Sequence, residues 1–134
     1  MIYTVAEAMS SPVVSVDRDM TVAAALTLMR RKGISSVLVR PRGPDNDWGI
    51  MTKRDVITKV VAQDLDPRAV RVGDIMTVHL ITARPEWTLK ECSLKMRAVG
   101  VRRLPVVNDQ GEVIGIISDT DIFQAVEERG WEGS

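Results

Sequence analysis

The sequence predicts an α/β fold (α+β by some conventions) in which two β-α-β-β-α repeats are related by a pseudo-twofold axis. Three observations carry this prediction. The motif V-A-E-A-M at 5–9 returns as V-G-D-I-M at 72–76. The motif G-I-M-T-K-R-D at 49–55 returns as G-I-I-S-D-T-D at 115–121. Between these motifs, short β-branched runs and helical patterns follow one another in the same order in both halves.

In the first repeat, strand and helix signals alternate clearly. A helix is predicted after Thr21 because apolar residues recur at helical spacing, cations fill the last turn and Gly33 follows as a stop signal. The β-branched runs on either side predict strands. The expected elements are a strand or an extended entry segment at 13–16, a helix at 21–32, strands at 36–39 and 48–51, and a helix from 52 or 53 to 61.

The second repeat predicts the same order. Thr88 or Glu86 caps the first helix, which ends at Gly100, and the turn at 108–111 places Gly111 where a positive φ is needed. The expected elements are an extended strand at 80–82, a helix at 88–99, strands at 103–107 and 113–117, and a helix at 119–128.

The length and net charge of the chain limit how many modules it can form and which partners it can bind. Each repeat spans about 66 of the 134 residues, a size at which a separate core is marginal, so we expect 1–66 and 67–134 to form one compact module. Lys and Arg number 18, as do Asp and Glu, so the net charge is zero. This balance argues against nucleic acid as the main partner, although it leaves room for a local basic pocket.

The reactive residues are few. Cys92 is the single cysteine, which excludes a disulfide within the chain and favours a reduced, cytoplasmic setting. No secretory signal and no apolar run of about 18 residues is seen, so we expect no membrane association. His79, the only histidine, lacks neighbours at metal-ligand spacing, and we expect no metal site. With no catalytic constellation visible, we expect a protein that is not an enzyme.

Together these motifs resemble a tandem pair of cystathionine-β-synthase-type (CBS) domains, a Bateman module. The likeness rests on V-x-[DE]-x-M, a helix ending in glycine, R-L-P-V-V at 103–107, and G-h-x-[ST]-x-x-D, where h is apolar. It covers about residues 5–126. The resemblance implies a stand-alone regulatory module that binds AMP, ADP or ATP in two clefts between the repeats, with no required cofactor.

The resemblance also implies the binding residues. A hydroxyl where a strand meets a helix suits a phosphate, and an aspartate one turn further along suits the ribose hydroxyls. These residues also have purely structural alternatives. The hydroxyl and the aspartate could simply stabilise the first turn of a helix, and Arg102 and Arg103 could be solvent-exposed or form salt bridges. Carried over, one cleft takes Ser118, Thr120 and Asp121 with Ile34, Ser35 and Ser36, and the other takes Thr52, Arg54 and Asp55 with Val101, Arg102 and Arg103.

The two clefts are not expected to be identical. Three arginines make the second the more basic, and we expect it to prefer the more highly phosphorylated ligand. Leu38 stands where the second repeat has Pro105, and the turn at 40–47 is longer than its counterpart, which puts the symmetry in question. Another adenosyl ligand, S-adenosylmethionine or NAD, and a ligand-free interaction module are the alternatives.

The resemblance further implies a homodimer, with a separate target protein as a possible second partner. Binding of the small molecule would then shift the population of the dimer or of the partner-bound state. The expected dimer faces lie on the last helix of each repeat and comprise Val56, Val60, Val61, Ile122, Phe123 and Val126.

Overall fold

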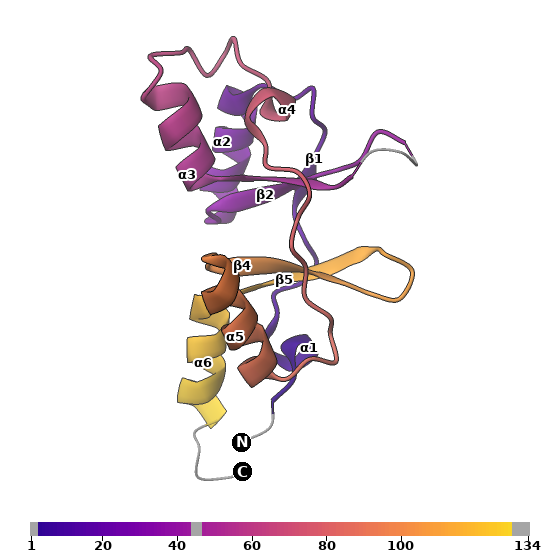
Figure 1. The fold of residues 1–134 in the computed structure, drawn as a ribbon. Helices are drawn as coiled ribbons and strands as arrows, with labels where there is room; N and C mark the ends of the chain where they lie inside the picture. Colours follow the sequence, from indigo (N-terminus) through magenta and orange to yellow (C-terminus); the bar gives the residue numbers. More distant parts are fainter. Residues whose placement is uncertain (1–2, 44–46, 130–134) are drawn as a thin grey trace. The chain divides into compact units, whose positions relative to one another are not determined.

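The computed structural model describes residues 3–43 and 47–129. The chain divides into two compact units: Val14–Leu80, and a unit that joins Met1–Val13 to Ile81–Ser134 (Figure 1). The short helix that opens each sequence repeat therefore belongs to the compact unit of the other repeat. The boundary expected between residues 66 and 67 concerns the sequence repeats, and it stays a prediction.

The unit Val14–Leu80 contains a three-stranded sheet with the order β1-β2-β3. Strand β2 pairs parallel to β1 and antiparallel to β3. Helices α2 and α3 lie on the same side of this sheet (Figure 1). The elements are β1 (Ser15–Val16), α2 (Val22–Lys32), β2 (Ser36–Val39), β3 (Gly49–Thr52), α3 (Lys53–Val56), the π-helix η1 (Ile57–Val61) and α4 (Val72–Ile75).

The second unit contains a two-stranded antiparallel sheet. Its elements are α1 (Val5–Ala8), α5 (Leu89–Val99), β4 (Arg103–Val107), β5 (Val113–Ser118) and α6 (Asp119–Arg129). The α/β fold class and most of the expected elements are confirmed. The predicted strand at 80–82 is wrong, because only Ala83 forms a single parallel bridge, to Val106.

The missing strand follows from a proline. In the first unit the amide of Leu38 donates to Val14 O at 3.0 Å, and the amide of Arg40 donates to Val16 O at 2.9 Å. The second unit keeps the later bond, from Val107 N to Ala83 O at 3.0 Å. Pro105 occupies the position of Leu38 and has no N–H to donate, so the first bond of that ladder cannot form.

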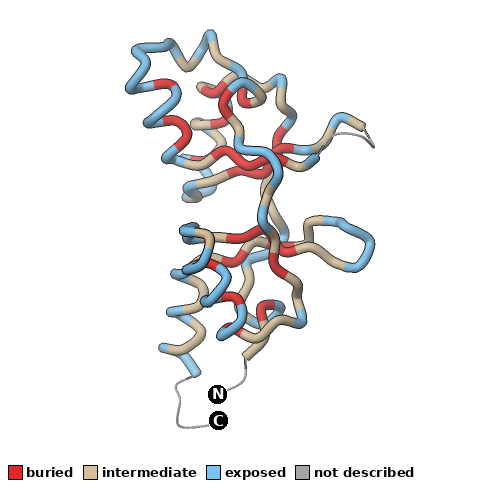
Figure 2. Tube along the Cα trace, in the orientation of Figure 1, coloured by how far each residue is buried: buried red, intermediate tan, exposed pale blue. Residues whose placement is uncertain are grey.

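Each unit has its own core (Figure 2). In the first, Val22 and Ala25 of α2 pack with Val37 of β2 and with Val60. In the second, Val5 of α1, Cys92 of α5, Leu104 of β4 and Ile117 of β5 are all fully buried. Both helices therefore bury one apolar face, as their periodicity predicts, although Leu94 of α5 is exposed. Val56 and Val60 belong to the core of the first unit as well, so they cannot form the expected dimer face, whereas Val61 and Phe123 are each 65% exposed.

The opening motifs V-x-[DE]-x-M form one-turn helices with matching contacts. Met9 lies against Gly115, where an added Cβ would come within 2.6 Å of its sulfur, and Met76 lies against Gly49 at 2.7 Å. Next to each methionine the backbone continues the sheet, because Ser10 pairs with Ile116 and Thr77 with Ile50. The methionine that ends each V-x-[DE]-x-M motif therefore leaves no room for a side chain at the glycine it contacts, Gly115 or Gly49.

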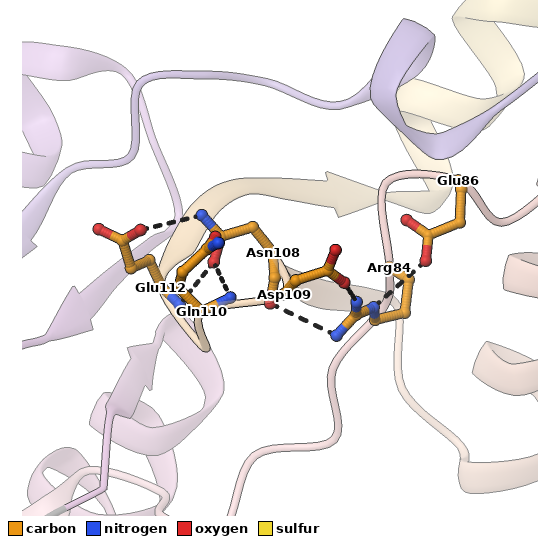
Figure 3. Close-up of polar contacts among 6 residues, drawn as sticks. All are labelled: Arg84, Glu86, Asn108, Asp109, Gln110 and Glu112. Atoms are coloured by element: carbon orange, nitrogen blue, oxygen red, sulfur yellow. Dashed lines mark hydrogen bonds and ion pairs between the residues drawn. The ribbon is translucent and has the colours of Figure 1, made fainter.

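The turn at 108–111 is as predicted, with Gly111 at φ 77°. Asn108 Oδ1 accepts from the amides of Gln110 at 3.0 Å and Glu112 at 2.9 Å. Arg84 points at this turn, donates to Asn108 O at 3.4 Å and pairs with Asp109 (Figure 3). The side chains around the turn thus hold it to the segment that precedes α5.

Candidate functional site

The first predicted phosphate and ribose group lies where β3 meets α3. Thr52 Oγ1 accepts from the Asp55 amide at 3.2 Å, and Asp55 Oδ2 accepts from the Thr52 amide at 2.9 Å. The two residues therefore form a reciprocal capping box, which satisfies amides that the helix itself cannot pair. The capping alternative is confirmed here, and it leaves a ligand role for these residues untested.

The second group lies where β5 meets α6 and has the same geometry. Ser118 Oγ accepts from the Asp121 amide at 3.1 Å, and Asp121 Oδ2 accepts from the Ser118 amide at 2.9 Å. Helix α6 is a regular α-helix of 11 residues, whereas α3 has 4 residues before it changes to the π-helix η1. The positive end of a helix dipole is thus better developed at Ser118.

The two aspartates differ at their other carboxylate oxygen. Asp55 Oδ1 accepts from Thr77 Oγ1 at 3.2 Å and lies 3.2 Å from the ammonium of Lys59. Within residues 3–43 and 47–129, the only hydrogen bond that Asp121 Oδ1 accepts is a long one, from Ser10 Oγ at 3.3 Å. Asp55 is 8% exposed, and Asp121 is partly exposed. Among the residues that the structure describes, no Lys or Arg forms an ion pair with Asp121.

The residues between each aspartate and its hydroxyl partner face solvent. Arg54 and Thr120 are both exposed in the first turn of their helices. The amide of Thr120 donates to Asp119 Oδ1 at 2.8 Å. An anion arriving at this helix start therefore competes with the carboxylate of Asp119 for that amide.

The predicted base-pocket segments follow the left-handed glycines Gly33 (φ 65°) and Gly100 (φ 72°). Ser35 O accepts from the Lys53 amide at 3.0 Å, and Arg102 O accepts from the Asp119 amide at 2.9 Å. Each helix start is thus bonded to the base segment of its own repeat. The crossed grouping that the family resemblance implies stays a prediction.

An open hollow of about 360 Å³ lies in the second unit. Val101 and Arg102, both predicted site residues, line it together with Asp119. Its other walls are apolar and basic, and they include Met96, Arg97 and Ile122. A cavity with an apolar floor and a few charged groups can accept a flat, partly polar molecule.

Sequence reasoning missed Lys59, Thr77 and Ser10. Thr77 and Ser10 each follow the last residue of a V-x-[DE]-x-M motif, so the repeat offset already linked them. The Asp55–Lys59 spacing of four is a standard helix ion-pair signal. Both signals were available, but neither predicts which side chain reaches the aspartate.

The candidate reactive residues are accounted for. Cys92 is fully buried, and burial raises the pKa of its thiol to about 11, as expected for an inert core cysteine. His79 is exposed, and its Nδ1 lies 3.3 Å from Asp47 Oδ2. Within residues 3–43 and 47–129, no group of three or more His, Cys, Asp and Glu residues could hold a metal ion, and no helix is both long and apolar enough to cross a membrane.

The comparison with protein families identifies the fold and the motifs. The model of the CBS domain matches twice, at residues 5–62 and 72–128. The chain therefore belongs to the CBS domain family, and it is a CBS domain pair. Pairs of this kind are typically regulatory modules.

Three similar proteins illustrate the relationship. An uncharacterized protein of Methanopyrus kandleri is 41% identical over 72% of this chain and 48% of its own length. A putative signal-transduction protein with CBS domains from Burkholderia ambifaria has a TM-score of 0.84 and 35% identity, covering 96% of both chains. The CBS domain pair of protein MJ0100, in complex with 5′-methylthioadenosine and S-adenosyl-L-methionine, has a TM-score of 0.82 and 24% identity, over 96% and 99%. The chain spans about half the length of the first curated relatives it matches.

Proposed function

We propose that this chain is a stand-alone regulatory module that binds an adenosyl ligand, with the adenine nucleotides AMP, ADP and ATP as the preferred class. The observation that carries the proposal is the Ser118–Asp121 pair at the start of α6. It places a hydroxyl, a helix N-terminus and a partly exposed carboxylate within one helical turn.

The chemistry of this pair suits a nucleoside phosphate. Among the described residues, Ser10 is the only donor to Asp121 Oδ1, and its hydrogen bond is long, so this oxygen has lone pairs to accept hydrogen bonds from ribose hydroxyls. Thr120 and Ser118 add hydroxyl groups next to it. Val101 and Arg102, which the crossed grouping assigns to the ligand of the Thr52–Asp55 group, line an apolar and basic hollow that suits a base or a phosphate.

The remaining predicted residues keep their proposed roles. Thr52, Arg54 and Asp55 repeat the ribose and phosphate chemistry, and Ile34, Ser35, Ser36 and Arg103 complete the base segments. The crossed grouping of these residues and the preference of the more basic group for the more phosphorylated ligand are part of this proposal.

Adenosyl ligands without a phosphate form a second class to be tested. A CBS pair of the same fold was crystallised with S-adenosyl-L-methionine and 5′-methylthioadenosine. Because a sulfonium ligand lacks a phosphate, it would use the carboxylate and the hollow without the helix dipole. A panel that includes AMP, ADP, ATP, NAD and S-adenosylmethionine separates these ligand classes.

We propose a regulatory role without turnover, in the cytoplasm, by a homodimer that acts on a target protein. The raised pKa of Cys92 supports the first point, because a thiol with a pKa of about 11 is protonated at neutral pH and cannot act as a nucleophile. The exposed Phe123 and Val61 support an interface on the last helix of each repeat.

Thermal unfolding with the ligand panel tests the proposal. A ligand that binds only the folded state adds about 2.7 kcal/mol to its stability at 100 times the dissociation constant. We expect at least one adenosyl ligand to raise the melting temperature of the wild type and of Glu128→Gln, an exposed control on the same helix. The ligand should have no such effect on Asp121→Asn. An unchanged melting temperature with every compound would reject the adenosyl role.

A further inference from the structure

One of the polar differences between the two helix starts directly concerns their aspartates. Lys59 lies four residues after Asp55, and the matching position after Asp121 is Ala125. The ammonium of Lys59 lies 3.2 Å from Asp55 Oδ1 and also donates to Ile75 O, the last residue of α4, at 2.9 Å. The lysine therefore connects three segments of its unit: α3, η1 and α4.

This contact occupies the part of Asp55 that a ribose would need. Oδ2 accepts from both the amide and the hydroxyl of Thr52. Oδ1 accepts from Thr77 and is paired with Lys59. With 11% of its side chain exposed, Asp55 offers little surface to a solute. Displacing the Lys59 ammonium would leave this poorly exposed carboxylate without its counter-ion, so a neutral ribose hydroxyl is a weak competitor for Oδ1.

Asp121 has the opposite properties. It keeps the capping bond from the Ser118 amide, but in the part of the chain that the structure describes its second oxygen accepts only from Ser10, at 3.3 Å, longer than a normal O–H···O bond. The helix that it caps is also regular over all 11 residues. A ribose hydroxyl can therefore replace the Ser10 hydroxyl at small cost.

We infer that Lys59 determines which of the two aspartates is available to a ligand. It acts as an internal counter-ion that closes the Thr52–Asp55 group, so that the wild-type chain binds one adenosyl ligand, through Asp121. The ligand role proposed above for the Thr52–Asp55 group then becomes available only when the Lys59 ammonium is removed or displaced. This inference rests on the proposed function for its ligand, but the closure of Asp55 can be measured without one.

Carbodiimide labelling of the folded, full chain with glycine ethyl ester tests the closure directly. We expect peptide mass spectrometry to show Asp121 modified several-fold faster than Asp55 in the wild type. Lys59→Ala, which copies the residue at 125, should raise the Asp55 rate toward that of Asp121. Lys53→Ala, an exposed lysine of the same helix, should leave it unchanged. Equal rates for the two aspartates in the wild type would overturn the inference.

Calorimetric titration with ATP and with AMP supplies the second measurement. We expect one ligand per chain, retained in Asp55→Asn, lost in Asp121→Asn, and increased toward two per chain in Lys59→Ala. Two ligands per wild-type chain, or loss of binding in Asp55→Asn alone, would overturn the inference and leave the proposed function intact. Absence of binding by every adenosyl compound would reject the proposed function, while the labelling rates would still decide whether Lys59 closes Asp55.

Discussion

The two units use the same motifs but differ in where each strand and each aspartate finds its partner. The first unit has a three-stranded sheet, and its Asp55 carboxylate is paired with Lys59. The second unit has a two-stranded sheet, and its Asp121 carboxylate can accept further hydrogen bonds. Single positions mark these differences: Leu38 against Pro105 and Lys59 against Ala125. Two copies of one fold can thus keep the same core while their strand pairing and the partners of their polar side chains diverge.

The largest expected effect comes from giving the first unit the proline of the second. Leu38→Pro removes the N–H that donates to Val14 O and also the side chain of a residue that is 2% exposed. We expect a loss of about 4 kcal/mol in the free energy of unfolding, of which about 3 comes from the side chain and about 1 from the unpaired carbonyl. Urea denaturation followed by circular dichroism measures it.

Leu38→Ala is the matched control, because it removes most of the side chain and keeps the amide. The difference between the two variants isolates the ladder bond that Pro105 lacks in the second unit. Identical unfolding midpoints for Leu38→Pro and Leu38→Ala would contradict our explanation for the missing strand at 80–82.

The second prediction compares the two aspartates by stability. Asp55→Asn removes the negative charge that faces Lys59, so we expect it to lower the free energy of unfolding by about 2 kcal/mol. Asp121→Asn loses only part of a capping interaction, which we expect to cost about 0.5–1 kcal/mol. Thermal denaturation at low ionic strength measures both. A larger loss for Asp121→Asn than for Asp55→Asn would contradict the expected stabilisation by the Asp55–Lys59 pair.

The sequence alone predicted most of these elements because local signals and burial agreed. The caps at Thr21 and Thr88, the glycines at 33 and 100, and the turn at 108–111 are decided within a few residues, and all are confirmed. The exchange of the opening helices between the compact units was not predicted, because periodicity reports which segments are alike and not which ones pack together.

The candidate site was predictable in part for the same reason. The hydroxyl–aspartate spacing is local, so its capping geometry could be expected from the sequence. The partners of the free carboxylate oxygens come from Thr77, 22 residues after Asp55, and from Ser10, 111 residues before Asp121. Pairings at such separations depend on the packed fold, which explains why Thr77 and Ser10 were missed.

A third prediction concerns the close contact between a glycine and a methionine that recurs inside each unit. In Gly115→Ala, the new Cβ would lie 2.6 Å from the sulfur of Met9 and 3.0 Å from Ser10 O. We expect a loss of about 1.5 kcal/mol, and a similar loss for Gly49→Ala, which meets Met76 and a backbone oxygen at 3.3 Å. Gly43→Ala, with open space around its Cβ, is the control and should be nearly neutral. A neutral Gly115→Ala would disprove the close approach.

The smallest effect is expected at a core position where the units carry different residues. Cys92 of α5 corresponds to Ala25 of α2, and both are fully buried. Cys92→Ala removes one sulfur atom at a position where alanine already packs in the first unit, so we expect a loss of about 1 kcal/mol or less.

The thiol also reports on the packing of the second unit. Because burial raises its pKa to about 11, about one molecule in a thousand carries the thiolate at pH 8, against about one in four for a free thiol with a pKa of about 8.5. Alkylation by iodoacetamide should therefore be slow in the folded protein and should accelerate both above pH 10 and in urea. Rapid labelling at pH 8 without denaturant would mean that α5 opens readily, and the second unit, with its two-stranded sheet, would then be the less stable of the two.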